Sequence, residues 1–340
     1  MNFRLNKKLI KERALTNKLS KQLKCFNRLV LWGYKSPRHS HYYIHQGYYS
    51  FFKQNIDIDI VWLENEEASN DLIEPNDLIM IPDTHLISNY ESLKIDKPRL
   101  DCFYIYHNSI KLPEHWLDKN IKYIKLYEYR NGYKKDLIQK GVSFKEIRPF
   151  VLTSSSDRSI LQPWGFPILP SKMLSPVTAK TNQVNFAGTI WGDKEGKLNG
   201  NYFKIKKLNE LLDSKGLEFN VRTKMTEEEE ISFLRKSIVS TSIGAIGHDA
   251  SDYLQCRIFK SITYGVLTLT DTKAFKHILK DSFVNFKSWD EGIDLVTNLN
   301  EKEKRKIIKA QQKSIFDYSY LNHWINMLDL FKEIYPEQFR

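Results

Sequence analysis

The sequence lacks several features that would each point to a class of protein. It holds three cysteines, Cys25, Cys102 and Cys256, which are too few and too scattered for a disulfide framework or a cysteine-rich metal site, so we expect buried free thiols. No apolar run approaches the roughly 18 residues that a membrane-spanning helix needs. The chain also begins without the apolar core of a signal peptide, and this absence predicts a cytoplasmic protein.

Familiar phosphate-binding and metal-binding motifs are missing as well. There is no GxxxxGK[ST] motif, because Trp191 stands where the first glycine would have to precede Gly196 and Lys197, and this argues against a P-loop kinase. His41 and His45 are four residues apart, but the glutamate of HExxH and an obvious third ligand are lacking, so no metal is expected. No RNA-binding or DNA-binding motif appears either.

Positive charge is what the sequence has in excess. It carries 52 Lys and Arg against 41 Asp and Glu, a formal net charge of +11. Such an excess favours polyanions, an anionic membrane surface or phosphorylated substrates, without choosing among them. With 41% apolar residues, the chain can still bury sizeable cores.

Residues 1–28 concentrate this charge, with nine Lys or Arg against one Glu. Apolar side chains recur there at roughly helical spacing: Leu5, Leu9, Leu15, Leu19, Leu23 and Phe26. We therefore predict a basic amphipathic helix. One interpretation is a helix that rests on an anionic membrane surface, at the inner face of the membrane. The other is a solvated helix packed against its own domain.

Residues 29–161 are predicted to form an N-terminal α/β domain. Short apolar runs predict strands at 29–32, 58–62, 78–81, 101–107 and 121–126, with a further strand over 144–152. A helix is predicted over 41–54. Strands that alternate with helices and loops indicate a parallel sheet.

Residues 162–181 are predicted to connect two domains, because four prolines fall between Pro163 and Pro176. Two domains also suit a chain of 340 residues at about 150 residues per domain. Residues 182–300 resume the α/β pattern as a C-terminal domain, and residues 301–340 form a helical segment that could return to the N-terminal domain. The predicted elements of the C-terminal domain are strands at 184–187, 217–221, 238–243, 266–269 and 283–286, and helices at 202–214, after Thr226, after 271 and near 289.

The stretch 249–270 reads as a loop, a helix and a buried strand. The helix is predicted to begin near Ser251 and to end before Gly265. Arg257 and Lys260 lie three residues apart on one face of it. Because a loop that feeds a helix N-terminus favours an anion, we predict half of a phosphate-binding cleft here.

The residues that follow the strands of the second half extend this prediction. In two-domain α/β proteins, ligands bind at the carboxyl ends of the strands. Glycine loops there allow close approach of backbone N–H groups, and cations bind phosphate, so the combination suits a diphosphate. The predicted diphosphate-binding residues are Gly188, Thr189, Arg222, Lys224, Gly244, Ser251, Tyr253, Arg257 and Lys260.

Polar residues after the strands of the first half are candidates for the other side of the cleft. His41 is predicted to act as a general base that deprotonates a hydroxyl, and Asp83, after the third strand, is a second catalytic candidate. His39, His45 and His107 are predicted to bind an acceptor. A hydrogen-bonded structural role is the alternative for each histidine.

Three segments between residues 184 and 270 share a family pattern: VNFAGTIWG, EFNVRTK and YLQCRIFKSITYGVLTLT. They resemble the C-terminal domain of GT-B glycosyltransferases, most nearly bacterial enzymes of the group-1 and CgeB-like kind. In that family the corresponding segments surround a nucleotide-sugar diphosphate. Arg257, Phe259 and Gly265 keep the family spacing, whereas Lys260 stands where many relatives carry a Glu that contacts the donor.

The resemblance implies an α/β fold of two Rossmann-like domains that face each other across a cleft. It also implies a metal-independent glycosyltransferase with no cofactor besides its nucleotide-sugar co-substrate. The acceptor would be a glycan, a lipid-linked sugar or a polysaccharide in bacterial surface polysaccharide synthesis. Arg222, Lys224, Arg257 and Lys260 would neutralise the leaving diphosphate, and His41 would be the acceptor base if the reaction inverts.

Two alternatives come from other functional classes. A nucleic-acid-binding protein is suggested by the net charge and by basic, tyrosine-rich stretches, and a glucosyltransferase acting on DNA bases would combine both interpretations. A non-catalytic protein that binds sugar nucleotides is the other alternative.

Overall fold

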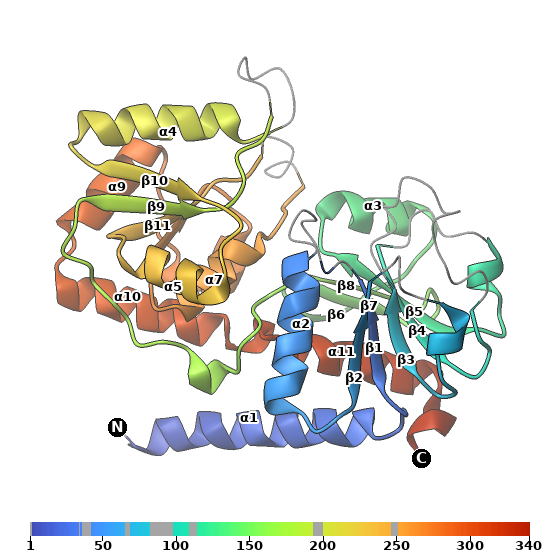
Figure 1. Cartoon of the computed structure of the whole chain (residues 1–340). Coiled ribbons are helices and arrows are strands. Elements are labelled where there is room, and N and C mark those ends of the chain that lie inside the picture. Colours follow the sequence, from blue (N-terminus) through green and yellow to red (C-terminus); the bar gives the residue numbers. More distant parts are fainter. Residues whose placement is uncertain are drawn as a thin grey trace. The chain divides into compact units, whose positions relative to one another are not determined.

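The computed structural model of the chain describes residues 2–33, 35, 42–64, 69–81, 98–108, 114–192, 200–245 and 251–340. The chain forms two compact units (Figure 1). The first comprises Met1–Tyr129, Tyr133–Ser171 and Tyr320–Arg340, and the second comprises Arg130–Gly132 and Lys172–Ser319. The chain leaves the first unit after Ser171 and enters the second at Lys172, inside the predicted connection 162–181. The segment 301–340 is divided, because residues up to Ser319 belong to the second unit and residues from Tyr320 belong to the first.

An eight-stranded sheet in the order β2-β1-β3-β4-β5-β8-β7-β6 forms the centre of the first unit. Neighbours from β2 to β8 pair in parallel, and β7 and β6 add an antiparallel hairpin at one edge. All residues of β1, β3 and β4 are buried, as expected for strands covered on both faces. The strands are β1 (Leu29–Trp32), β2 (Ile60–Leu63), β3 (Leu78–Ile81), β4 (Phe103–His107), β5 (Lys122–Glu128), β6 (Lys145–Arg148), β7 (Val151–Ser154) and β8 (Ser159–Gln162).

Helices surround this sheet, and the last long helix of the chain, α11, packs against β5 and β8. It carries eleven buried residues, so it is a core helix of the first unit. The described helices are α1 (Asn2–Leu23), α2 (Tyr42–Asn55), α3 (Asn131–Gln139) and α11 (Tyr320–Ile334), with short 3-10 turns η1 (Asn70–Leu72), η3 (Glu114–Leu117), η4 (Pro170–Lys172) and η7 (Pro336–Phe339). None of the helices in the described ranges is long and apolar enough to cross a membrane.

The basic N-terminal helix α1 packs against its own domain. Leu19 and Leu23 are buried, Lys18 Nζ forms an ion pair with Asp329 Oδ2 of α11 at 2.6 Å, and Gln22 donates to the other oxygen of that carboxylate at 2.8 Å. The structure therefore shows the second of the two arrangements that the sequence allowed. Binding of residues 1–28 to a membrane stays a prediction.

The second unit is built on a smaller parallel sheet in the order β10-β9-β11-β12. One face is covered by α4, α9 and α10, and the other by α5 and the C-terminal end of α7 (Figure 1). The strands are β9 (Gln183–Ala187), β10 (Glu218–Arg222), β11 (Val239–Ser242) and β12 (Thr268–Thr270). The helices are α4 (Tyr202–Ser214), α5 (Glu227–Arg235), α7 (Cys256–Thr263), α8 (Phe275–Leu279), α9 (Trp289–Asn298) and α10 (Glu301–Ser314), with 3-10 turns η5 (Lys280–Ser282) and η6 (Phe316–Tyr318).

Local sequence signals explain where several of these helices begin. Thr226 and Glu229 form the predicted capping box at the start of α5, and Asn300 and Glu303 form another at the start of α10. Ser288 accepts a hydrogen bond from Glu291 N at the start of α9.

Two strand predictions were wrong. The region 144–152 holds two short strands, β6 and β7, because a bulge between Glu146 and Arg148 and the positive φ of Phe150 (63°) turn the chain back on itself. Residues 283–286 form no strand. Phe283 and Phe286 are buried there against helices, and Phe286 packs on Trp289 at 5.1 Å between ring centroids.

The cysteines are free thiols, as expected. Only Cys102 is buried, whereas Cys25 and Cys256 are half-buried, so the expectation of burial holds for one of the three.

A buried histidine joins α11 to the core of the first unit. His323 Nε2 lies 3.0 Å from the hydroxyl of Tyr48 on α2, and its ring stacks on Trp164 at 5.8 Å with an interplanar angle of 8°. Burial lowers the pKa of His323 to about 3. The folded protein therefore holds this imidazole neutral across the range in which a histidine of the unfolded chain takes up a proton.

We expect the stability of this core to fall in mild acid because of His323. Between an unfolded pKa near 6.5 and the folded value, only the unfolded chain binds the proton, so the free energy of unfolding falls as the pH is lowered, by about 2 kcal/mol between pH 7 and pH 5 for this group. Urea unfolding of wild type and His323→Gln at both pH values isolates the effect. The free energy of unfolding of wild type minus that of His323→Gln should be lower at pH 5 than at pH 7 by about that amount. The same value at both pH values would contradict a buried neutral His323.

Candidate functional site

The carboxyl ends of the four strands of the second unit lie at one edge of its parallel sheet. β10 pairs with one side of β9, and the next strand of the chain, β11, pairs with the other side of β9. The direction in which strands are added to the sheet therefore reverses between β9 and β11. Ligands of open α/β sheets bind at such a switch point. Gly188 follows β9 and Gly244 follows β11, so both predicted glycine loops lie there.

Arg257, in the first turn of α7, reaches this edge. Its Cζ lies 4.9 Å from the centroid of the Phe186 ring in β9. A Cβ on Gly188 would lie 2.8 Å from Arg257 Nη1, so the absence of a side chain at Gly188 leaves the space that the guanidinium occupies. Gly188 N donates to Arg222 O at 2.8 Å, which fixes the backbone at this point.

The Nη1 atom of Arg257 is buried, and it has no hydrogen-bond partner among the described residues. A buried N–H of a charged group costs free energy unless it is paired, and a guanidinium is suited to carboxylate or phosphate oxygens. We call Arg257, Phe186 and Gly188 the Arg257 site, a candidate anion site at this edge of the second sheet.

The loop after β9 is held in place by a buried asparagine. Asn201 Oδ1 accepts from Trp191 N at 2.9 Å, and Asn201 Nδ2 donates to Thr189 O at 3.0 Å. The hydroxyls of Thr189 and Thr223 are 3.2 Å apart. Thr189 thus lies beside the Arg257 site on a loop with a defined conformation.

The loop after β11 is held by a carboxylate. Gly244 N donates to Asp271 Oδ1 at 3.1 Å, and Lys204 Nζ pairs with Asp271 Oδ2 at 3.0 Å. Sequence reasoning missed Asp271 and Lys204. Their signal was weak, because Asp271 only follows the end of a strand and Lys204 is one of many lysines.

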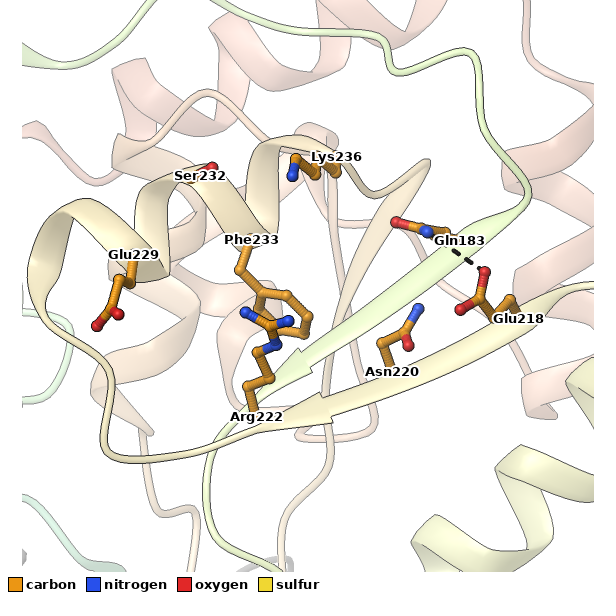
Figure 2. A pocket seen from close by; sticks show the side chains of 8 residues that line it. All are labelled: Gln183, Glu218, Asn220, Arg222, Glu229, Ser232, Phe233 and Lys236. Atoms are coloured by element: carbon orange, nitrogen blue, oxygen red, sulfur yellow. Dashed lines mark hydrogen bonds between the residues drawn. The ribbon is translucent and has the colours of Figure 1, made fainter.

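Arg222 and Arg257 do not converge on one ligand position. Arg222 pairs with Ala187 in the parallel ladder, so its side chain points to the face that α5 covers, and its Cζ lies 5.4 Å from the Phe233 ring of α5 (Figure 2). Phe186, under Arg257, points to the opposite face. Lys224 is exposed in a turn with φ of 55°. The structure therefore groups Arg222 with α5 and Arg257 with β9.

Lys260 is already paired inside the second unit. Its Nζ lies 2.9 Å from Glu230 Oε2 of α5, and the two side chains are 18% and 13% exposed. Burial, the largest influence, lowers the pKa of Lys260, but the nearby charges, with Glu230 first, raise it overall. Since this carboxylate neutralises the ammonium, Lys260 ties α7 to α5. The sequence prediction had instead assigned it to a diphosphate.

The predicted helix start near Ser251 was wrong. Ser251 and Asp252 form a turn in which Asp252 has a φ of 51°, and α7 begins at Cys256 after Gln255. A residue in the left-handed region cannot continue a helix, so the helix N-terminus lies several residues further along. Tyr253 lies in the segment before the helix, 4.9 Å from Arg130 Cζ, and Arg130 belongs to the same unit.

The described histidine candidates of the first unit are buried at the carboxyl edge of its sheet. His107 ends β4, and its ring lies 6.3 Å from that of His45. A Cβ on Gly33, just after β1, would lie 2.2 Å from His45 Nδ1, so His45 packs against the end of β1. The two side chains are 0% and 1% exposed, which favours the structural role that the sequence left open for each. His39, His41 and Asp83 lie outside the described residues.

Sequence reasoning missed one further polar residue at this edge, Glu128. Glu128, at the end of β5, is 3% exposed, and its backbone N–H donates to Asn108 Oδ1 at 3.1 Å. Asn108 follows β4 with a φ of 43°. A buried carboxylate at a strand end had no distinguishing signal in the sequence, because the predicted strand stopped at residue 126.

Within the described ranges, no three His, Cys, Asp or Glu residues are grouped so that they could hold a metal ion. The expectation that no metal takes part stays a prediction.

Replacing Lys260 is expected to destabilise the second unit. Lys260→Ala leaves the partly buried Glu230 carboxylate without its cation. Loss of one partner of a fully buried pair costs about 3–5 kcal/mol, so we expect a somewhat smaller loss of stability here. The melting temperature of this variant should be clearly lower than that of wild type. The double variant Lys260→Met/Glu230→Leu removes both charges and keeps the volume, so it should recover most of the lost melting temperature. A Lys260→Ala protein as stable as wild type would mean that the pair does not hold α5 and α7 together.

No family model matches the sequence, and no curated protein matches it. Solved structures do match. A structure of the DNA-modifying enzyme β-glucosyltransferase, determined with and without uridine diphosphoglucose, superposes with a TM-score of 0.50 at 14% identity, over 90% of this chain and 99% of that one. Structures of T4 phage BGT with UDP-glucose and with UDP and Mn²⁺ superpose with the same TM-score at 12% and 13% identity, over 90% of this chain and 98% and 99% of theirs.

These matches span nearly the whole length of both proteins, so they concern both units. At sequence identities of 12–14%, these matches establish the fold of the chain. The predicted class is confirmed: the chain has the α/β fold of the GT-B glycosyltransferases, with two Rossmann-like units.

Proposed function

We propose that the protein is a glycosyltransferase that moves a sugar from a nucleotide-sugar donor to an acceptor. The observation that carries the proposal is the buried Arg257 Nη1, which has no hydrogen-bond partner among the described residues and lies at the switch point of the second sheet. A diphosphate supplies the charge and the oxygen acceptors that this guanidinium needs. The absence of a side chain at Gly188 leaves room for the guanidinium at this strand end.

Stabilisation of the leaving group is the chemistry that this site suits. An acceptor hydroxyl attacks the anomeric carbon of the sugar, the bond from that carbon to the phosphate oxygen breaks, and the nucleoside diphosphate leaves with the electron pair. Negative charge grows on the phosphate oxygens as the bond breaks, so a preorganised guanidinium lowers the barrier. The acceptor proton passes to a base, for which we propose His41 or Asp83.

A uridine diphosphate sugar is the proposed donor, since the similar T4 phage structures contain UDP-glucose or UDP. The remaining predicted donor residues, Thr189, Gly244, Ser251 and Tyr253, would contact the diphosphate or the sugar and nucleoside attached to it. We also propose that transfer needs no metal. Because one similar structure holds Mn²⁺ with UDP, the assay should compare EDTA with added Mn²⁺.

Two acceptor classes follow from different observations. The resemblance of residues 184–270 to group-1 and CgeB-like enzymes favours a glycan or a lipid-linked acceptor in surface polysaccharide synthesis. The fold likeness to a DNA-modifying glucosyltransferase, together with the net charge of +11, favours DNA. We propose DNA as the second candidate.

Transfer of radiolabelled glucose from UDP-glucose distinguishes these acceptors. One reaction contains duplex DNA whose bases carry a hydroxyl group, since the transfer needs such a nucleophile, and the other contains extracted glycolipid and polysaccharide. Label in the DNA fraction alone supports the second candidate. Binding of UDP-glucose with neither hydrolysis nor transfer under any condition would indicate a non-catalytic sugar-nucleotide binder.

Replacing Arg257 should lower activity strongly without unfolding the protein. A hydrogen bond to a charged group contributes about 1.5–3 kcal/mol, so Arg257→Ala should reduce kcat/KM for donor hydrolysis or transfer by roughly 10-fold to 100-fold. Circular dichroism checks that the variant is folded. Lys276→Ala, which removes an exposed charge from α8 of the same unit, is the matched control and should keep wild-type activity. Transfer at the wild-type rate by Arg257→Ala would refute the proposed role of this site.

A further inference from the structure

A pocket of about 340 Å³ lies in the second unit between α5 and the edge of the sheet (Figure 2). Its size falls within the range of small-molecule sites. We call it the α5 pocket. It is lined by Gln183, Glu218, Asn220, Arg222, Glu229, Ser232, Phe233 and Lys236.

The spacing of these residues explains why they meet. Glu218, Asn220 and Arg222 alternate along β10, so they point to the same face of the sheet. The other wall comes from positions 229, 232, 233 and 236, which share one face of α5 and its C-cap. Because β10 is an edge strand, no further strand in the described part of the unit covers that side.

The two carboxylates of the α5 pocket are already engaged. Glu229 Oε2 accepts from Thr226 N at 2.7 Å in the capping box, and this backbone hydrogen bond is the main reason why the pKa of Glu229 is lowered, with a smaller contribution from Arg222. Glu218 Oε2 accepts from Gln183 Nε2 at 3.3 Å. No oxygen of either carboxylate lies within 4 Å of a nitrogen of Arg222 or Lys236, although the charge of Arg222 acts on Glu229 at longer range.

The side chains left for a ligand are hydrogen-bond donors. Arg222 lies over the Phe233 ring, and in the described part of the chain neither its guanidinium nor the Lys236 ammonium donates a hydrogen bond or lies within 4 Å of a carboxylate oxygen. Ser232 and Asn220 add a hydroxyl and an amide without hydrogen bonds to described residues. Two cations and two neutral donors around an aromatic wall suit an anion with several acceptor oxygens.

We propose that the α5 pocket is a second anion site, which binds the phosphate group of a phosphorylated ligand. It is distinct from the Arg257 site, because Arg222 and Phe186 point to opposite faces of the second sheet. The phosphate belongs either to a free small molecule or to the backbone of a nucleic acid.

The test uses the full-length chain with Arg257→Ala as background, so that binding at the Arg257 site does not contribute. The pocket variant adds Arg222→Gln and Lys236→Gln. The control adds Lys206→Gln and Lys276→Gln, which remove the same charge from exposed positions of the same unit. Two probes are used, inorganic phosphate followed by calorimetry and a fluorescein-labelled 12-base-pair DNA duplex followed by anisotropy at several salt concentrations.

Loss of phosphate binding by at least about 10-fold in the pocket variant, with the control unchanged, supports the site. It identifies a small phosphorylated molecule as the source if the duplex binds the pocket and control variants alike. For a nucleic-acid source, the slope of log K against log [salt] for the duplex should fall by about 1.8 in the pocket variant and less in the control. Equal behaviour of the pocket and control variants with both probes overturns the proposal, as does the absence of binding of either probe to the background protein.

Discussion

The proposed activity depends on one interaction, the contact of the Arg257 guanidinium with the Phe186 ring over Gly188. The aromatic face holds the cation without neutralising it. Gly188 allows the approach because it has no side chain. As a result, the buried Arg257 Nη1 lies near the end of β9 without a hydrogen-bond partner among the described residues. Such a donor is costly to keep in a fold, and an anionic ligand removes the cost.

The surrounding structure keeps this donor available. The charge of Lys260, one turn further along α7, is neutralised by Glu230, so this cation holds two helices together. Lys204 and Asp271 brace the loop after β11, and Asn201 braces the loop after β9. These contacts preorganise the backbone around Arg257. An anion that binds there meets groups whose positions are already set, which reduces the entropy lost on binding.

Much of the fold could be predicted from the sequence, because its signals are local. Apolar runs of four residues predicted β1 and β3, and the capping box at Thr226 predicted α5. The hairpin β6–β7 escaped prediction, since its turn depends on the left-handed conformation of Phe150, a residue type that rarely marks one. The start of α7 was misplaced for a similar reason, the left-handed Asp252.

The candidate site was harder to predict, because spacing along one strand does not report the register with its neighbours or which helix covers each face. Arg222 ends β10 and Arg257 lies in the first turn of α7, so both are near the same edge of the sheet. The register of β10 with β9 nevertheless places Arg222 beside α5, on the face opposite to Phe186. Likewise, the sequence places Arg257 and Lys260 on one helix face, but only tertiary packing shows that Glu230 lies beside Lys260. His41 and Asp83 lie outside the described residues, so their roles rest on the sequence.

Calorimetric binding of UDP and of uridine to wild type and to Arg257→Ala tests the central claim most directly. The two ligands differ only in the diphosphate, so their comparison separates recognition of phosphate from recognition of the nucleoside. If Arg257 binds the diphosphate, the substitution should weaken UDP binding by roughly 10-fold to 100-fold and leave the binding of uridine unchanged. Unchanged UDP affinity, or an equal loss for both ligands, would contradict the account.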